Sequence, residues 1–260
     1  MYILNSEEFQ TEIRQIAGLS LKGIMERSFA DWTDNTMEYF KRHILECYLH
    51  KNPTIRRTIS NLINTFLRHG GMEMWPEILE FLLNHLDTNL GVEMSLETLN
   101  IIIEDSGSYI EENYSHFMHQ LIPKLFFFLT EMGKRKNEER SDTLIILVLH
   151  TLNILLENCS NTMIDHLETT SGILVYFHDS ENFDMRYHIG QCWLSMIRMK
   201  KEVLIDRSSI LFLLYLQNLA AENYKMNFIA AEFLLYIVEE EEELINDENI
   251  KEKIFYHLEV

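Results

Sequence analysis

A short helical pattern recurs along the chain, and few folds other than a repetitive helical one can accommodate it. The strings begin at Ile13 (IRQIAGLSL), Ile55 (IRRTISNLI), Met185 (MRYHIGQCWL) and Met226 (MNFIAAEFLL). Each string has apolar residues three and four positions apart, which form one face of an α-helix. Arginine holds the second place in three of them, and a small residue follows four to five positions later. The small residues predict close packing of these helices against their neighbours.

Another helix precedes each of these, so the repeating unit is a helical hairpin. In one unit the first helix begins near Leu167, the polar stretch HDSENFD follows, and the second helix carries apolar residues from Met185 to Ile197. Pairs of helices that recur about every 40 to 47 residues are typical of HEAT repeats. The predicted fold class is therefore all-α, a HEAT-repeat α-solenoid that forms a right-handed superhelix of antiparallel helix pairs.

We expect one continuous stack over residues 1–260, because no stretch rich in Pro, Gly or Ser separates domains. The predicted units are 1–30 (partial), 34–73, 75–116, 117–161, 164–203, 205–240 and 241–260 (partial). Proline is tolerated in the first turn of a helix, because the N–H that it lacks would have no intrahelical partner there. Pro76 and Pro123 are therefore expected to open first helices at equivalent places, and Pro53 to open a second helix.

The formal net charge of −19 limits the classes of partner. Such a charge repels phosphate backbones and so argues against nucleic-acid binding, whereas it favours basic protein partners. The longest apolar runs, Leu144–Leu149 and Ile210–Leu216, are too short to cross a bilayer. The first ten residues lack the pattern of a signal peptide. We expect a soluble protein that does not insert into membranes.

Catalytic and metal-binding patterns are not found in the sequence. It contains no phosphate-binding loop, no nucleophile elbow and no dinucleotide fingerprint. His116 and His119 are spaced to share a metal, but no further ligand completes a set nearby, so a surface pair is the better interpretation. The three cysteines, Cys47, Cys159 and Cys192, fit small buried side chains in a reducing compartment. We expect neither enzymatic activity nor a cofactor.

Four strings in fixed order resemble a known family. They are AGLSLK (Ala17–Lys22), NPTIRRTISNLINTFLRHGGMEMWPEIL (Asn52–Leu79), IIIEDSGSYI (Ile101–Ile110) and IPKLFFFL (Ile122–Leu129). In these strings the chain resembles the importin-β (karyopherin-β) family of nuclear import receptors, most closely the N-terminal part of its transportin type. The resemblance runs from about Ile13 to Glu239, over the second to seventh repeats of the family and the start of the eighth.

The resemblance implies a shuttling protein that is both cytoplasmic and nuclear and whose partners are proteins. In the family the N-terminal arch binds the small GTPase Ran in its GTP form, and the C-terminal arch binds cargo through its nuclear localisation signal. Nucleoporins are further partners that the resemblance allows. Binding of cargo is expected only if the missing C-terminal arch is supplied.

The family also suggests which residues meet Ran, because its second helices line the concave surface where Ran docks. The candidates for this contact are Lys22, Glu93, Glu97, Glu104 and Asp105. Carboxylates such as Glu104 and Asp105 are disfavoured at the C-terminal end of a helix, which argues for a partner there. A solvated helix end is the alternative for these two, and a solvated lysine is the alternative for Lys22.

Other features have a structural interpretation. Arg14, Arg56 and Arg186 are predicted to form a ladder in which each arginine pairs with an acidic residue of a neighbouring unit, with Asp184 and Asp34 as plausible partners. Trp75, directly before Pro76, is expected to wedge between adjacent units, and Phe126–Phe128 to pack in the core. The acidic run Glu239–Glu243 is read as a solvated helix end, and Lys134–Arg140 as an ordinary loop.

A different class of function fits the same repeats. A HEAT scaffold or adaptor, such as the structural subunit of a phosphatase, would also be an all-helical binder. Such scaffolds have more uniform units, and the longer loop in residues 117–161, together with the AGLSLK and WPEIL strings, argues against this alternative.

Overall fold

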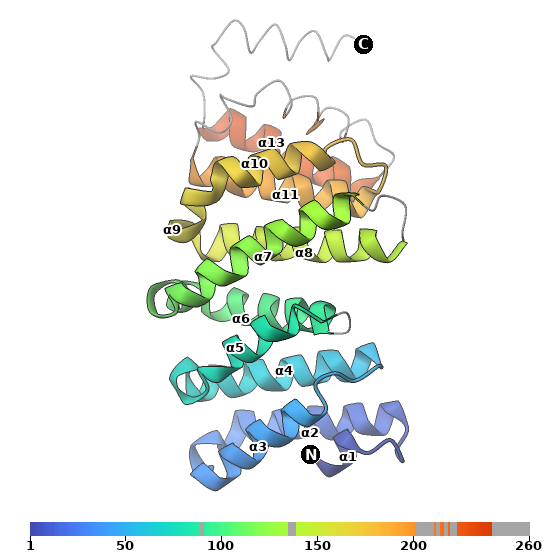
Figure 1. Ribbon diagram of the computed structural model, residues 1–260, viewed down its shortest axis with the longest axis vertical. Coiled ribbons are helices and arrows are strands. Elements are labelled where there is room, and N and C mark those ends of the chain that lie inside the picture. Colours follow the sequence, from blue (N-terminus) through green and yellow to red (C-terminus); the bar gives the residue numbers. More distant parts are fainter. Residues whose placement is uncertain are drawn as a thin grey trace, which may run out of the picture. The chain divides into compact units, whose positions relative to one another are not determined.

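The protein is all-α in the computed structural model, which describes residues 1–88, 91–134, 139–200 and 223–240, together with Leu211, Leu214, Tyr215 and Asn218 (Figure 1). Over these residues every regular element is a helix. The helices are α1 (Tyr2–Asn5), α2 (Thr11–Ser28), α3 (Asp34–Glu46), α4 (Pro53–Gly70), α5 (Glu77–His85), α6 (Gly91–Asn113), α7 (Ser115–Lys134), α8 (Glu139–Asn158), α9 (Ser160–Met163), α10 (Leu167–Phe177), α11 (Phe183–Met199) and α13 (Tyr224–Glu240). Short 3₁₀ turns follow α2, α4 and α9, at Phe29–Asp31, Met72–Met74 and Ile164–His166.

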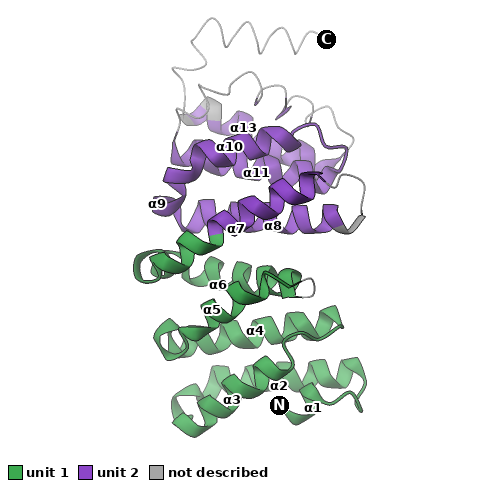
Figure 2. Cartoon of the chain, in the orientation of Figure 1, with its two compact units in different colours: residues 1–121 green, residues 122–260 purple. Residues whose placement is uncertain are grey.

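The chain divides into two compact units, residues 1–121 and residues 122–260 (Figure 2). Unit 1 contains the predicted repeats at 34–73, formed by α3 and α4, and at 75–116, formed by α5 and α6. Unit 2 contains the predicted repeat at 164–203, formed by α10 and α11. That all repeats form one continuous stack stays a prediction.

In unit 1 the second helices pack on one another. Helix α2 packs on α4, α4 packs on α6, and α5 packs on α6. Helix α4 starts where Asn52 caps it, since the Oδ1 atom of Asn52 accepts hydrogen bonds from the backbone N–H groups of Thr54 (2.9 Å) and Ile55 (3.4 Å). Pro53 occupies the first turn, as predicted.

In unit 2 helix α11 packs on α8, α10 and α13. Asn182 caps α11 in the same way as Asn52 caps α4, because its Oδ1 accepts from the N–H groups of Asp184 (3.0 Å) and Met185 (3.2 Å). In both units this asparagine stands four residues before the repeated arginine. The cap therefore sets where the second helix begins and which face its arginine occupies.

A cluster of aromatic rings fills the core between α3, α4 and the start of α5. Phe66 is fully buried, and its ring centroid lies 5.2 Å from that of Phe40 and 5.3 Å from that of Phe29. Trp75, which is 4% exposed, meets Phe66 edge-on at 5.5 Å. Such offset and edge-to-face arrangements are favourable beyond the area that they bury.

The small residues of the repeated pattern allow close helix contacts, as the sequence predicts. A Cβ atom added at Gly18 on α2 would lie 2.3 Å from the Cγ2 atom of Thr58 on α4. At Gly190 on α11 it would lie 3.1 Å from the Cγ1 atom of Ile229 on α13. Both glycines therefore let the backbones of neighbouring second helices approach to a distance that larger residues would prevent.

We predict that Gly18→Ala lowers the free energy of unfolding by about 1–3 kcal/mol, because the new methyl group overpacks the contact. Thr58 does not rotate away freely, since its hydroxyl donates to the carbonyl of Thr54 (2.8 Å). Chemical denaturation measures the change, and the double variant Gly18→Ala, Thr58→Ser should recover it, because serine keeps the hydroxyl and lacks Cγ2.

The matched control for this prediction is Gly172→Ala on α10, where an added Cβ would meet no atom within 4 Å. There the higher helix propensity of alanine should stabilise the protein by roughly 0.5–1 kcal/mol. Equal effects of the two substitutions would show that Gly18 has no special packing role.

Helix α7 departs from the prediction in two ways. Pro123 lies inside the helix and does not open it, because α7 already begins at Ser115. Buried apolar residues lie on one face of α7 both before and after the proline, and Pro123 itself lies on the exposed side of the helix. The expectation of a core Phe126–Phe128 is also wrong, since Phe127 is 62% exposed while Leu125 and Leu129 point inward.

Some predictions fall on parts of the chain outside the described residues. These are residues 205–222 of the unit at 205–240, apart from Leu211, Leu214, Tyr215 and Asn218, all of 241–260 with the end of the acidic run Glu239–Glu243, and residues 135–138 of the basic stretch. Across the described helices, no single one is long and apolar enough to cross a membrane. The segments Ser141–Asn158 and Ser160–Phe177, bent by 110° at their junction, meet the length and composition criteria only as a pair.

Candidate functional site

A groove of about 370 Å³ opens on the second helices of unit 1. It brings together two of the residues predicted to meet a partner, Lys22 from α2 and Glu97 from α6. Its lining is completed by Gln15, Gly18, Leu19, Pro53, Thr54, Arg57, Thr58, Asn61 and Leu62.

The helical repeat explains how α2 and α4 contribute to this groove. Gly18 and Lys22 stand four residues apart on α2, and Arg57 and Asn61 stand four apart on α4, so each pair lies on one face. Leu19 adds an apolar side chain that is 55% exposed. The groove thus combines cationic, anionic, amide and apolar groups, which suits recognition of a protein surface.

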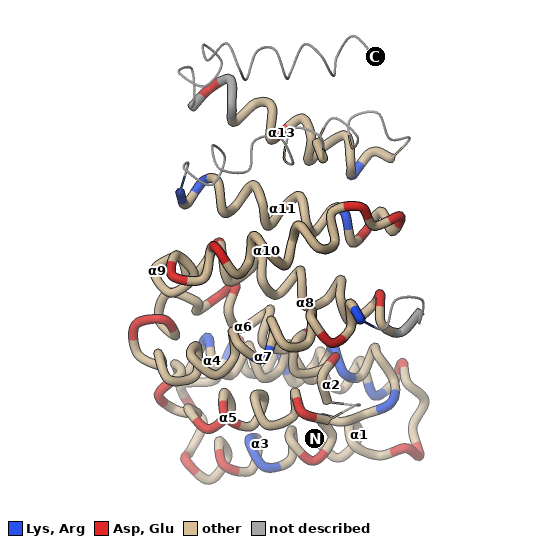
Figure 3. The backbone as a smooth tube through the Cα atoms, turned by 45° about the horizontal axis from the view of Figure 1, so that its top comes forward, with Lys and Arg blue, Asp and Glu red and all other residues tan. Residues whose placement is uncertain are grey.

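The acidic residues of α6 face the basic residues of α4, and Figure 3 shows both charge types on the helices of unit 1. The Nη2 atom of Arg56 lies 3.6 Å from Oε2 of Glu93, and Nε of Arg68 lies 3.6 Å from Oδ2 of Asp105. Asp105 also accepts a hydrogen bond from the side-chain amide of Asn64 (2.8 Å). Glu93 and Asp105 are therefore engaged in contacts within the protein, and Asp105 is exposed to solvent as Glu104 is.

Glu97 has the most perturbed environment of the predicted contact residues. Burial raises the pKa of its carboxyl group, and the positive charges of Arg56 and Arg57 partly oppose that shift. A half-buried carboxylate beside two guanidinium groups is a strong acceptor for a donor on a partner. Lys22, across the groove, has its Nζ 3.7 Å from Oε1 of Glu26.

The arginine series meets mostly neutral oxygens. Buried Arg14 donates from Nε to the carbonyl of Leu4 (2.8 Å), and Arg186 donates to the side-chain oxygen of Asn218. Within the described residues, Arg56 alone of the three arginines pairs with a carboxylate, that of Glu93, and it also donates to the carbonyl of Lys51 (3.1 Å).

Both of the acidic partners suggested from sequence are corrected for the described part of the chain. Asp184 accepts a hydrogen bond from Nζ of Lys225 (2.8 Å), and Asp34 lies exposed in the first turn of α3. The physical reason is proximity: Arg14 and Arg56 reach carbonyl oxygens of the chain that leads into their own helices, and Arg186 reaches the side-chain oxygen of Asn218. Pro76 directly precedes α5, and Trp75 packs in the aromatic cluster beside it.

Groups that could do chemistry are dispersed or buried. No group of three or more His, Cys, Asp and Glu residues suited to a metal occurs among the described residues. His116 and His119 are both exposed. All three cysteines are buried as free thiols, and burial raises the pKa of Cys47 to about 12, which makes its reactive thiolate scarce.

Sequence reasoning missed Arg57 and Asn61, which form much of the wall of the groove. Their signal was present as the four-residue spacing Pro53, Arg57, Asn61 on the polar side of α4. That spacing identifies one polar face but does not show that the face lies beside Lys22 and Glu97.

Comparison with known proteins identifies relatives among the transportins and importin beta-2. The chain matches no protein-family model. It is 35% identical to a transportin of Dictyostelium discoideum over 129 residues, which are 48% of this chain and 14% of that protein. It is 22% identical to transportin-1 of Mus musculus over 240 residues, which cover 91% of this chain and 26% of that protein. It is also 22% identical to importin subunit beta-2 of Schizosaccharomyces pombe over 247 residues, which cover 92% of this chain and 26% of that protein.

The matched stretches thus span about a quarter of these relatives or less, 14% to 26% of their length. Helix pairs at the spacing of the repeated pattern, together with these relatives, place the fold in the HEAT-repeat α-solenoid class. The chain is similar to the transportins of the importin-β (karyopherin-β) family.

Proposed function

We propose that the chain acts in nuclear import as a transportin-type receptor, or as part of one, by binding the GTP form of Ran on the second helices of unit 1. The observation that carries the proposal is the groove between α2, α4 and α6, which holds Lys22 and Glu97 together on a chain similar to transportins. Cytoplasmic and nuclear localisation follows from the same proposal. Binding of cargo would require the C-terminal arch that the family uses for it.

The contact that we propose uses both signs of charge. Glu97 and exposed Glu104 offer acceptors to basic groups of the GTPase, while Lys22 and Arg57 offer donors to its acidic groups. Mixed charges of this kind fix the register of a complex and suppress wrong partners more than they add affinity. Cargo and Ran that bind one receptor must then affect each other's affinity equally.

Charge reversal tests the surface. We predict that Glu104→Lys and Glu97→Lys each weaken binding of GTP-Ran by about tenfold, because each places a cation against basic groups of the partner. Titration calorimetry with Ran loaded with a non-hydrolysable GTP analogue measures the change. The control is Glu80→Lys on first helix α5, which alters the net charge equally, is exposed and should leave affinity unchanged.

Nucleotide dependence tests the function itself. The intact chain should bind Ran with the GTP analogue and not with GDP. Equal binding of both forms, or of neither, would exclude the receptor and favour a HEAT scaffold such as a phosphatase structural subunit. If both charge-reversed variants keep their affinity for GTP-Ran, the contact with Ran must lie on another surface of the chain.

A further inference from the structure

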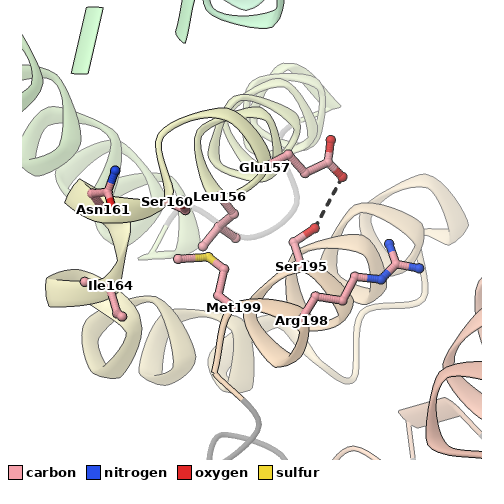
Figure 4. Close-up of a pocket in the computed structure, with 8 residues that line it drawn as sticks. All are labelled: Leu156, Glu157, Ser160, Asn161, Ile164, Ser195, Arg198 and Met199. Carbon is pink, nitrogen blue, oxygen red and sulfur yellow. Dashed lines mark hydrogen bonds between the residues drawn. The ribbon is translucent and has the colours of Figure 1, made fainter. Parts of the chain in front are cut away.

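Unit 2 contains a pocket of about 520 Å³, larger than the groove of unit 1, and the two sites share no lining residue (Figure 4). It lies between the C-terminal ends of α8 and α11 and the short helix α9. Buried Leu156 and Ser195 form its floor, and the exposed side chains of Glu157, Ser160 and Ile164 form its rim. A pocket of this volume has room for a side chain of a partner.

The carboxylate of Glu157 is held in a fixed position by neutral groups. It accepts hydrogen bonds from the side-chain amide of Asn153 (3.0 Å) and from the hydroxyl of Ser195 (3.3 Å). No ion pair joins Glu157 to a cation within the described residues. The rim therefore carries an oriented carboxylate that forms no ion pair with a cation of the described part of the chain.

The backbone adds to this negative potential. Helix α8 ends at Asn158 and α11 ends at Met199, so the last carbonyl groups of both helices lie beside the pocket. These carbonyls carry partial negative charge; α8 has no basic residue in its last turn, whereas the last turn of α11 contains Arg198. A cation entering the pocket would be stabilised by Glu157 and by the C-terminal end of α8.

The basic residue at the pocket leaves room for such a cation. In Figure 4 the guanidinium group of Arg198 extends away from Leu156 and Met199. Its Nη2 atom lies 3.8 Å from Oε1 of Glu232 on α13. Arg198 is thus directed to α13, and the space between the apolar side chains stays open to a ligand.

We infer that this pocket binds an arginine side chain presented by a protein partner. The apolar side chains of Leu156, Ile164 and Met199 would contact the methylene groups of the arginine, and Glu157 would accept hydrogen bonds from its guanidinium group. Arginine fits better than lysine, because its planar fork can donate to the carboxylate and to terminal carbonyls together. The site goes beyond the proposed GTPase surface, which lies in unit 1.

The test uses the intact chain labelled with ¹³C in its methionine and isoleucine methyl groups. Titration with N-acetyl-arginine amide should shift the methyl resonances of Met199 and Ile164 in a saturable way. N-acetyl-citrulline amide, which has the same shape without the charge, should bind at least tenfold more weakly, since charge-assisted hydrogen bonds are about twice as strong as neutral ones.

Two variants localise the effect. Glu157→Gln keeps the acceptor for Asn153 and Ser195 but removes the charge, and should weaken arginine binding about tenfold. Glu168→Gln, an exposed position on α10, changes the net charge equally and should not weaken it. Absence of a saturable shift, equal binding of citrulline, or unchanged binding by Glu157→Gln would each overturn the assignment. Equal binding of N-acetyl-lysine amide would overturn the preference for arginine. No arm involves Ran, so the outcome is independent of the proposed function.

Discussion

Replacement of Phe66 by alanine is expected to lower the free energy of unfolding by about 3–5 kcal/mol, the largest effect of any single substitution considered in this chain. Phe66 is fully buried on α4 and contacts the rings of Phe29, Phe40 and Trp75. Its ring is nearly parallel to that of Phe40, with 6° between the planes. Truncation would remove contacts to three neighbouring segments and leave a cavity that they are unable to fill together.

Urea denaturation followed by circular dichroism measures this loss. The control is Phe127→Ala on α7, where the ring is 62% exposed and its removal should change stability by less than about 0.5 kcal/mol. A loss at Phe66 no larger than that at Phe127 would show that the aromatic cluster is not a source of stability.

The second large effect concerns acid stability and His188 on α11. Its ring centroid lies 5.0 Å from that of His150 on α8, and Gln191, Asp184 and Lys225 also act on it. Burial, followed by the neighbouring His150, lowers the pKa of His188 to about 4 from an ordinary 6.5. The folded protein therefore favours the neutral imidazole.

The direction of the pH effect follows from proton uptake. Between pH 6.5 and about 4 the unfolded chain takes up a proton at His188 and the folded chain does not, so stability falls as pH falls. The slope is about 1.4 kcal/mol per pH unit, and the loss reaches roughly 3 kcal/mol near pH 4. Below that value both states are protonated and His188 contributes no further change.

His188→Gln removes the titrating group and keeps a polar side chain, so it isolates this contribution from the carboxylates that also titrate below pH 5. The free energy of unfolding, measured from pH 7 to 4, should decline less steeply in the variant than in the parent protein. Parallel curves for the two proteins would refute the assignment of this acid sensitivity to His188.

The repeated pattern predicted the second helices well, because it combines three sequence signals whose structural effect depends only on nearby residues. Apolar spacing gives the face, Pro53 marks the first turn of α4, and a small residue such as Gly18 marks a close contact. Each of these depends on backbone geometry and on excluded volume, which the residue type itself carries. Helix type and approximate bounds were therefore predictable.

The hydrogen-bond partner of a side chain was harder to predict than the helix face on which the side chain lies. Arg14 donates to the carbonyl of Leu4. Because every residue has a carbonyl oxygen, the sequence does not indicate which one accepts a given hydrogen bond. Pro123 lies within α7 because the buried stripe runs past it on both sides, which outweighs the lost hydrogen bond. In both places tertiary contacts decided between options that were locally equivalent.

The candidate site was predicted in part. Lys22 and Glu97 do line one groove, but Glu93 and Asp105 lie close to arginines of α4. Sequence spacing placed all four residues on second helices. It could not show that arginine side chains of α4 would lie close enough to pair with carboxylates of α6. Arg57 and Asn61 were missed because the polar face of α4 becomes part of a groove only when α2 packs beside it, and the sequence does not show that packing.

The neutral acceptors of Arg14 and Arg186 have a consequence for the response of the fold to salt. Dissolved ions screen attraction between opposite charges, but a bond from a guanidinium group to a carbonyl or amide oxygen has little such attraction to lose. The chain carries 41 acidic side chains against 22 basic ones, and the same ions screen the repulsion among the excess. Rising ionic strength should therefore leave the contacts of Arg14 and Arg186 largely intact and reduce the repulsion among the excess carboxylates, while it weakens ion pairs such as Arg56–Glu93 and Arg68–Asp105.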